Sequence, residues 1–317
     1  MSPVRQARRR IGPYGAAPVV RLSADATSTG PTVMRVTIVG SGTSAPQPET
    51  PASGILVETS STGILVDCGQ GVIRGTMPIR DPRELDAIVV GHLHADHYID
   101  VVSLRYLLPW AGFTGRRLPI LLPPGGRQRM DELASAISER AGFFDHTFDV
   151  REYDPDVELT IGDLRLGFLP GNHYVPAWGC RLRDEAGHVV VVSGDTGPNE
   201  RLVDSARGAD ILVIEATLLA AGEDDPKRGH LTVDEAVAIG RDAKVGRTVL
   251  VHHRTQNHEA VVAASEASES VQVGRPGLVV ELDDVAGSTN PDSAEHHGDG
   301  DPPPTSGETS ASIAAAS

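Results

Sequence analysis

The six-residue run His92-Leu93-His94-Ala95-Asp96-His97 constrains this chain more than any other feature of its sequence. It contains three imidazoles and one carboxylate, and it follows the apolar run Leu85–Val90 after a single glycine. That apolar run is rich in β-branched residues, which predicts a buried strand. Imidazole nitrogen and carboxylate oxygen are the usual zinc donors in hydrolytic sites. The stretch therefore predicts a metal-binding loop at the end of a strand.

Length and cysteine content narrow the class of protein. A chain of 317 residues can bury a substantial core as one large domain or two small ones. No apolar run approaches the roughly 20 residues that span a bilayer. Cys68 and Cys180 are the two cysteines, so a disulfide framework is excluded and we expect two small buried side chains in a reducing cytoplasm. Arg8–Arg10 precede a stretch with two prolines and two glycines, which is a poor export signal.

The charge of the chain is acidic, with a formal net charge of −15. An acidic surface disfavours broad, nonspecific binding to a nucleic-acid backbone. A small phosphate ester at a metal centre remains compatible with this charge, because the metal supplies the local positive charge.

Composition divides the chain into three segments. Residues 1–33 are rich in Pro, Gly, Ser, Thr and Ala, and we predict a disordered extension; Met34, which opens the first convincing strand, is a candidate start. Residues 286–317 contain five acidic residues and no Lys or Arg, and we predict a disordered acidic tail. Residues 34–285 are predicted to form the folded domain.

Many short apolar runs with few helical patterns characterise residues 34–285. The order is strands then helix, repeated once, which predicts an α/β architecture of two packed mixed sheets with helices on the outer faces, an αββα sandwich. The clearest predicted strands are 36–39, 54–57, 63–66, 87–90, 118–122, 164–168, 188–192, 210–214, 248–251 and 277–282. Helices are predicted over Gln128–Ala141, over Thr232–Ala243, which opens with a capping box, and over Glu259–Glu269.

Residues that bind metals or transfer protons recur where later predicted strands end. Such positions gather on one edge of a packed pair of sheets, so remote residues can meet in one site. Five groups have this placement: His173, Asp195, Glu215, the pair His252 and His253, and His230 before a capped helix.

These motifs together resemble the metallo-β-lactamase fold superfamily and, within it, the RNase Z-like branch. The resemblance covers about residues 34–285. It rests on Gly40-Ser41-Gly42-Thr43, Asp67-Cys68-Gly69-Gln70-Gly71, the HxHxDH run at 92–97, His173, Ser193-Gly194-Asp195-Thr196, Glu215-Ala216-Thr217, His230-Leu231-Thr232 and His253.

The resemblance implies two divalent metal ions, zinc or in some members manganese. His92, His94 and His173 would hold the first ion, Asp96, His97 and His253 the second, and Asp195 would bridge them. From the residues alone His252 competes with His253 for the last position; the family pattern favours His253. A water between two such cations becomes hydroxide near neutral pH and attacks the ester. Catalysis is assigned to Asp96, Glu215 and His230, with His230 as proton donor to the leaving group and Glu215 orienting it.

The substrate is predicted from what the chain lacks relative to tRNA-processing members. Those members carry a basic P-x-K-x-R-N loop, whereas this chain has Pro46-Gln47-Pro48-Glu49-Thr50-Pro51. They also insert a basic arm, whereas Phe148–Leu169 is short, acidic and strand-like, and the whole chain has two lysines, Lys227 and Lys244. We therefore expect a phosphodiesterase for a small substrate such as a 3′,5′-cyclic nucleotide, with no membrane partner and, by resemblance, a homodimer.

Three alternatives stay open. The first is a tRNA 3′-end processing endoribonuclease. The second is hydrolysis of a carbon ester, thioester or lactam by the same metal centre. The third is a metal-stabilised scaffold without activity. Softer candidates for substrate contacts are Tyr98, Tyr174, Trp178 and Arg254, which flank the predicted ligands.

Overall fold

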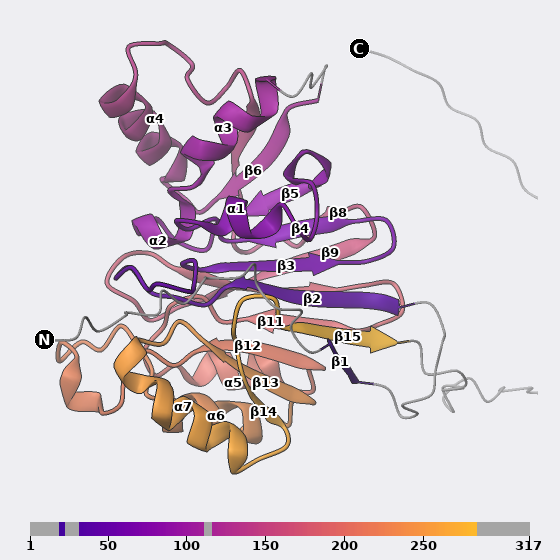
Figure 1. The fold of residues 1–317 in the computed structure, drawn as a ribbon, viewed down its shortest axis with the longest axis vertical. Coiled ribbons are helices and arrows are strands. Elements are labelled where there is room, and N and C mark those ends of the chain that lie inside the picture. Colours follow the sequence, from indigo (N-terminus) through magenta and orange to yellow (C-terminus); the bar gives the residue numbers. More distant parts are fainter. Residues whose placement is uncertain (1–18, 23–31, 111–115, 284–317) are drawn as a thin grey trace, which may run out of the picture. The chain divides into compact units, whose positions relative to one another are not determined.

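The computed structural model describes residues 19–22, 32–110 and 116–283. Within these residues the strands form one sheet of eight and one of seven. Both sheets mix parallel and antiparallel neighbours. Gly63–Val66 is parallel to Ala87–Val89 in the first sheet, and Leu164–Pro170 is antiparallel to Trp178–Arg183 in the second. Figure 1 shows the strands stacked between helices of the N-terminal half at one end and helices of the C-terminal half at the other.

The first sheet carries the HxHxDH run at the end of one central strand. Its spatial order is β1-β15-β2-β3-β4-β5-β6-β7. The bounds are β1 Val19–Leu22, β2 Thr32–Gly40, β3 Gly54–Glu58, β4 Gly63–Val66, β5 Ala87–Val89, β6 Leu118–Leu122, β7 Phe148–Glu152 and β15 Val279–Asp283.

The second sheet supplies the later candidate residues from successive strand ends. Its spatial order is β14-β13-β12-β11-β10-β9-β8. Because β11, β12 and β13 are parallel, their carboxyl ends meet at the same edge. The bounds are β8 Leu159–Ile161, β9 Leu164–Pro170, β10 Trp178–Arg183, β11 Val189–Val192, β12 Ile211–Glu215, β13 Arg247–Val251 and β14 Val271–Val273.

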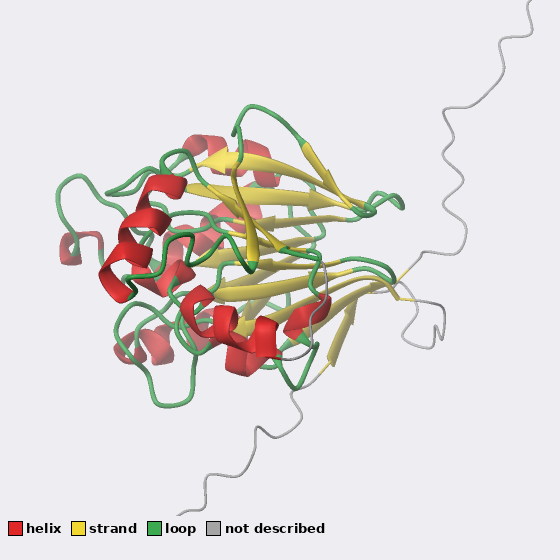
Figure 2. Cartoon of the chain, turned by 90° about the horizontal axis from the view of Figure 1, so that it is seen from above, coloured by secondary structure: helices red, strands yellow, loops and turns green. Residues whose placement is uncertain are grey.

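Helices cover the outer face of each sheet, at the two ends of the stack in Figure 1, and Figure 2 marks the helices in red and the strands in yellow. The α-helices are α1 Val72–Thr76, α2 Ala95–Tyr98, α3 Val101–Trp110, α4 Gly126–Ile137, α5 Glu200–Ala206, α6 Val233–Asp242 and α7 His258–Glu266. Short 3₁₀ helices are η1 Pro82–Glu84, η2 Ala221–Glu223 and η3 Thr255–Asn257. Of the described helices, none is long and apolar enough to cross a membrane.

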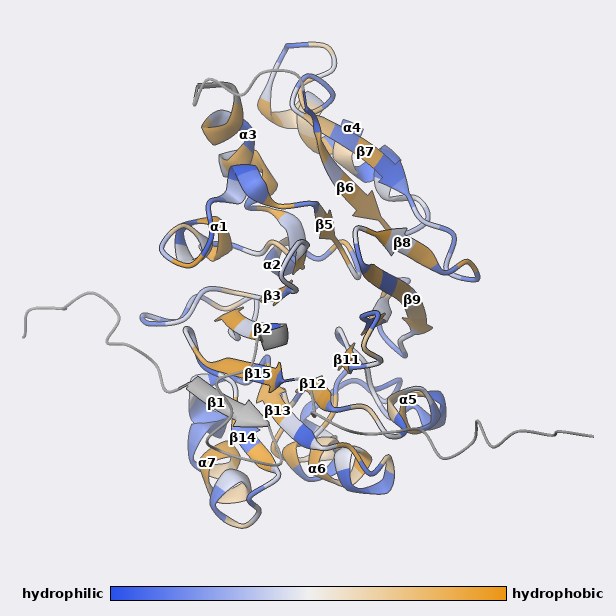
Figure 3. Cartoon of the chain, turned by 90° about the vertical axis from the view of Figure 1, so that its right-hand side faces the viewer, coloured by the Kyte–Doolittle hydropathy of each residue, from blue (hydrophilic) through white to orange (hydrophobic). Residues whose placement is uncertain are grey.

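Three apolar clusters hold these layers together. The first lies between the sheets and includes Ile38, Val66, Val190 and Val249. The second joins the first sheet to α1, α3 and α4, and the third joins the second sheet to α5, α6 and α7. In Figure 3 strands such as β6 are drawn mostly in the hydrophobic colour. Since both faces of each sheet are covered, the predicted αββα sandwich is confirmed.

Helix and strand boundaries differ from the sequence prediction in instructive places. The three predicted helices correspond to α4, α6 and α7, and Thr232 caps α6 through the Glu235 amide as the capping box predicts. The expected strand Leu85–Val90 is shorter, because η1 precedes it and β5 begins at Ala87. Helix α3 was not predicted, since its sequence is apolar on most positions and shows no amphipathic period.

The predicted disordered extension 1–33 is wrong for one segment. Val19–Leu22 form β1, which pairs in parallel with β15, and β2 already begins at Thr32. This pairing joins residues more than 250 positions apart, so no local sequence pattern announces it. The rest of 1–33 and the predicted tail 286–317 lie outside the described residues.

Candidate metal centre

The HxHxDH run was predicted to be a loop. In the structure its first residues are extended, and its last three residues belong to helix α2. His94 has extended backbone and caps the first turn of α2, which places Asp96 and His97 on that turn. The loop after β4 packs directly beneath it, with the Cys68 amide donating to the carbonyl of His97 at 2.6 Å. A side chain at Gly69 would overlap the carbonyl oxygen of Asp96, so this close approach requires glycine.

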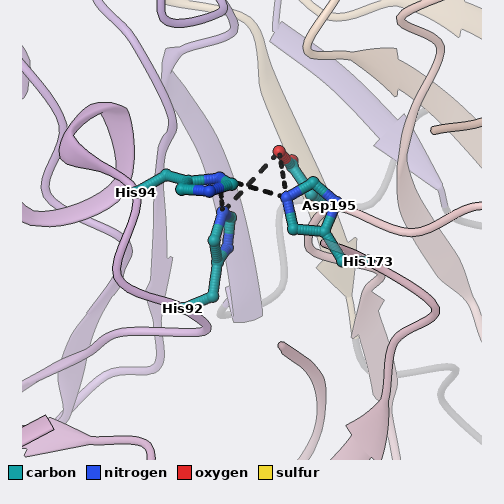
Figure 4. Close-up of side chains that lie close together, drawn as sticks. All are labelled: His92, His94, His173 and Asp195. Atoms are coloured by element: carbon teal, nitrogen blue, oxygen red, sulfur yellow. Dashed lines mark hydrogen bonds and ion pairs between the residues drawn. The ribbon is translucent and has the colours of Figure 1, made fainter. Parts of the chain in front are cut away.

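His92, His94, His173 and Asp195 form what we name the first group. His94 Nδ1 lies 3.1 Å from Nε2 of both His92 and His173. Oδ2 of Asp195 lies 3.8 Å from Nε2 of His92 and 3.9 Å from Nε2 of His173. Figure 4 shows His92 and His94 reaching in from one side and His173 and Asp195 from the other. The four donor atoms therefore converge on one point.

Asp96, His97 and His252 form the second group, and all three are buried. His252 Nε2 lies 3.3 Å from Asp96 Oδ2, and His97 Nε2 lies 3.7 Å from the same oxygen. Oδ2 of Asp195 is 3.4 Å from His97 Nε2 and 3.5 Å from His252 Nε2. The carboxylate of Asp195 thus lies between the two groups and faces both.

Burial and charge set the protonation of these groups. Burial, reinforced by the neighbouring imidazoles, lowers the pKa of His92 and of His94, and burial lowers that of His173, so these rings are neutral and can offer lone pairs. Burial opposes the charge of Asp195, but the surrounding histidines outweigh it and lower the pKa of its carboxyl. Burial likewise opposes the charge of His97, but Asp195 and Asp67 outweigh it and raise the pKa. The carboxylates of Asp67, Asp96 and Asp195 thus surround His97, and a cation beside them would be stabilised.

The residues present fit a metal pair by one direct observation. Nε2 of His97 is buried and has no hydrogen-bond partner among the described residues, although it faces two carboxylates. A buried polar atom without a partner is costly, and a cation offers it one. Nitrogen and oxygen donors in this mixture suit zinc, and also manganese.

Three anchors fix the orientation of the imidazoles. Nδ1 of His97 donates to Asp67 Oδ2 at 2.6 Å, and Nδ1 of His173 donates to the carbonyl of Gly229 at 2.8 Å. Nδ1 of His252 donates to Thr217 Oγ1 at 2.9 Å. Each contact occupies Nδ1 and leaves Nε2 facing the metal centre, the arrangement that supports metal-binding histidines.

Two of these residues have an uncommon backbone conformation. Asp67 has a φ of 63° and His252 a φ of 51°, both in the left-handed region that favours glycine. Asp67 also accepts hydrogen bonds from the Gly91 amide at 3.0 Å and from Ser53 Oγ at 2.9 Å. The left-handed turns redirect side chains at the ends of β4 and β13 toward the metal centre.

Glu215 and His230 form a hydrogen-bonded pair beside the candidate metal centre. His230 Nδ1 donates to Glu215 Oε1 at 3.0 Å, and Glu215 also accepts from the Thr196 amide at 2.7 Å. Burial opposes protonation of His230, but Glu215 outweighs it and raises the pKa to about 9. A ligand atom of His230 lies within 4.8 Å of those of Asp195 and His252. This pair places a protonated imidazole next to the candidate metals.

The structure corrects one predicted ligand, because His252 rather than His253 joins the second group. Val249 and Val251 face the core between the sheets, and strict alternation would send residue 253 to the same side. The left-handed turn at His252 breaks this alternation and brings His252 in instead. His253 is buried away from the group, and its ring lies 6.0 Å from that of His258. The other predicted ligands, His92, His94, Asp96, His97, His173 and Asp195, all lie together.

Sequence reasoning assigned no role to three residues that support the site. Asp67 and Thr217 lay inside the quoted motifs, so their position was known but not their contacts. Asp224 had no such signal; its carboxylate accepts from the amides of Gly229 at 2.9 Å and His230 at 3.2 Å.

The remaining candidates for substrate contact differ in how much of each side chain is exposed. Tyr98 and Trp178 are partly buried and pack against apolar clusters, whereas Tyr174 is exposed beside His173. Arg254 NH1 lies 4.0 Å from Glu223.

Comparison with known proteins agrees with this geometry. A family model described as "Beta-lactamase superfamily domain" matches residues 62–253, more than half of the chain. The chain is 28% identical over 222 residues to "Probable metallo-hydrolase YhfI" of Bacillus subtilis, covering 69% of this chain and 86% of that protein. It is 31% identical over 265 residues to "Ribonuclease Z" of Ignicoccus hospitalis, covering 69% of this chain and 87% of the relative.

A solved structure supports the same assignment. The crystal structure of the metallo-β-lactamase fold protein YhfI from Bacillus subtilis superposes with a TM-score of 0.66 at 25% identity, covering 78% of this chain and 98% of that one. The family match, these relatives and the clustered histidines and aspartates lead to one assignment. The chain belongs to the β-lactamase superfamily with the metallo-β-lactamase fold, in its RNase Z-like branch, and is a metal-dependent hydrolase.

Proposed function

We propose that the chain is a phosphodiesterase that uses two divalent metal ions, zinc or manganese, on a small substrate such as a 3′,5′-cyclic nucleotide. The observation that carries this proposal is the placement of the Glu215–His230 pair beside two complete groups of metal donors. A metal centre alone would serve many hydrolases. A protonated imidazole beside it suits an ester whose leaving oxygen needs a proton.

The ligands divide by the two groups. His92, His94 and His173 would hold one ion, Asp96, His97 and His252 the other, and Asp195 would contact both. When bound, such ions acidify water and neutralise charge on a phosphate. Asp67, Thr217 and the Gly229 carbonyl keep the imidazoles in the ligating orientation, which preserves the geometry through turnover.

His230 is the proposed proton donor to the leaving oxygen. Its Nδ1 is occupied by Glu215, so the proton that it transfers is the one on Nε2. Glu215 is itself fixed by Thr196 and Thr217, whose hydroxyl donates to Oε2 at 2.6 Å. The carboxylate stabilises the imidazolium form, which regains its Nε2 proton from water after each turnover.

The negative charge of the chain and the stretch that forms β7, β8 and β9 favour a small substrate over tRNA. The chain has a net charge of −15 and two lysines, and its 46–51 loop carries Glu49 in place of basic residues. The stretch that would hold a tRNA-gripping arm instead forms β7, β8 and β9 of the sheets. This combination leaves a weak electrostatic attraction for a long phosphate backbone.

A second candidate function, tRNA 3′-end processing, rests on the 31% identity to a protein named Ribonuclease Z. We also propose that the phosphodiesterase is a homodimer and is located in the cytoplasm. The location rests on Cys68 and Cys180, which are buried free thiols as a reducing compartment favours.

A competition assay tests the proposal. The full chain, loaded with zinc or manganese, is offered cyclic AMP and a 3′-extended precursor tRNA together, and products are separated by chromatography and gel. We expect turnover of cyclic AMP and intact tRNA. Asp96→Ala should abolish turnover, whereas His146→Ala, which replaces an exposed histidine outside both groups, should retain it.

Other outcomes identify the alternatives. Cleavage of the tRNA after its discriminator base would overturn the small-substrate choice. Turnover of a thioester or lactam, with cyclic AMP and tRNA both intact, would replace the phosphodiester with a carbonyl. Unchanged cyclic AMP turnover by Asp96→Ala would contradict the metal assignment.

A further inference from the structure

Tyr174 is an exposed aromatic ring at the edge of the metal centre. It follows the ligand His173 directly, and 40% of its surface is exposed. Its ring centroid lies 4.9 Å from that of His173 and 5.8 Å from that of His230. The ring is therefore next to one proposed ligand and next to the proposed proton donor.

The ring is held in place on two sides. Its hydroxyl donates to Asp224, which also accepts the amides of Gly229 and His230. A Cβ at position 229 would lie 2.6 Å from two ring carbons, so glycine lets the ring lie against the chain there. An aromatic ring fixed in this way loses little conformational entropy when a ligand stacks on it.

Other aromatic side chains near the site do not offer such a surface. Tyr98 and Trp178 pack against apolar clusters, and Tyr153 is stacked on Phe168 with centroids 3.7 Å apart. Tyr106 is exposed but belongs to α3, which carries none of the clustered residues, and it packs on Phe143. Tyr174 thus combines exposure, fixation and contact with functional histidines.

We propose that Tyr174 stacks on the base of a nucleotide substrate whose phosphate lies at the metal centre. The inference rests on the proposed function and adds a base-binding surface to it. A nucleotide holds its base one sugar ring away from its phosphate, so a base near Tyr174 would leave the phosphate within reach of the site that His173 and His230 line, whose ring centroids lie 4.9 Å and 5.8 Å from that of Tyr174. Stacking tolerates any base, because every base has an aromatic face, so purine and pyrimidine cyclic nucleotides should both bind.

The test compares two substrates with the same reacting phosphate. One is cyclic AMP, and the other is 1-O-methyl-ribose 3′,5′-cyclic phosphate, which lacks a base. The metal-loaded full chain, Tyr174→Leu and Tyr174→Phe are measured on both, with Tyr106→Leu as the matched control for losing an exposed tyrosine. We expect Tyr174→Leu to lower the ratio of kcat/KM for cyclic AMP over the base-free ester about tenfold or more, mainly by raising KM.

The ratio should stay near the wild-type value in Tyr174→Phe, which keeps the ring, and in Tyr106→Leu. An equal loss on both substrates in Tyr174→Leu would show that the ring only positions His173 or His230, and would overturn the stacking. An unchanged ratio would overturn it as well. Failure of the wild type on cyclic AMP while the base-free ester is cleaved would overturn the nucleotide substrate itself, which separates the two failures.

Discussion

The two donor groups of the metal centre differ in how the protein holds them. In the first group His94 is partly exposed, and His173 is oriented by a backbone carbonyl, that of Gly229. In the second group all three residues are buried, and His97 and His252 are oriented by the side chains of Asp67 and Thr217. The first group therefore has one partly exposed member and an anchor from the main chain, whereas the second is wholly buried and has anchors from side chains.

This difference teaches where sequence changes can act. A carbonyl acceptor survives every substitution that keeps the local chain path, but a side-chain acceptor is lost in a single substitution. The second group should therefore be the more sensitive to single changes outside the ligands themselves. The first group should respond mainly to changes in the ligands or in the 224–230 segment.

Removing the shared carboxylate should have the largest effect, because Asp195 faces both groups. We expect Asp195→Ala to lower kcat/KM on the order of 10³-fold or more and to reduce bound metal at both positions. Metal content by mass spectrometry and steady-state kinetics measure both effects. Asp156→Ala, at an exposed aspartate, is the control, and full metal content in Asp195→Ala would contradict its shared position.

Adjacent histidines at 252 and 253 test the second group. His252→Ala should remove about one ion per chain and lower kcat on the order of 100-fold, because it takes away one Nε2 donor. His253→Ala should keep the metal and lose folding stability instead, since its ring is buried. Thermal unfolding and metal titration separate these effects. The opposite pattern would restore His253 as the ligand.

Asp67→Asn sharpens the contrast between the groups. Asparagine tolerates the left-handed backbone at this position but provides a weaker acceptor for His97. We expect one metal site to lose about 10- to 100-fold in affinity while the other stays unchanged. Competition with a zinc chelator resolves the two sites. Equal weakening of both sites would mean that the groups are not independently held.

Thr217→Val should have the smallest effect. The hydroxyl joins His252 to Glu215, so its loss loosens both a ligand and the partner of the proton donor. We expect kcat to fall about tenfold, with little change in the fold, because valine has nearly the same shape. Thr62→Val, at another buried threonine, serves as comparison. A wild-type kcat in Thr217→Val would show that the hydrogen bonds from Thr217 to His252 and Glu215 do not contribute to the reaction.

The residues of this site that could be predicted from sequence lie close together in the chain or at the ends of apolar strands. His92, His94, Asp96 and His97 lie in one run. Glu215 is the last residue of an apolar strand and Asp195 lies shortly after the end of another, so their meeting at one edge follows from sheet geometry. The choice between His252 and His253 depends on a backbone dihedral at one residue, which residue type does not reveal.

Other parts of the structure depend on contacts across long sequence separations. The pairing of Val19–Leu22 with β15 joins opposite ends of the described chain, with Val19 beside Val279. Asp224 acts by accepting amides five and six residues later, inside a polar loop without a helical or strand period. Local patterns predict elements well, but they do not carry information on which loop carboxylate supports which peptide.

The left-handed conformations at Asp67 and His252 have a consequence for adapting this protein to heat. Each such residue costs roughly 1–2 kcal/mol of folding free energy that glycine would not incur. At position 67 the lost hydrogen bonds to Gly91, Ser53 and His97 would offset this gain, so selection for thermal stability without selection for turnover should enrich glycine at position 252 first. Survivors of such a screen would be sturdier molecules with a disabled metal centre, an instance of the trade between stability and activity.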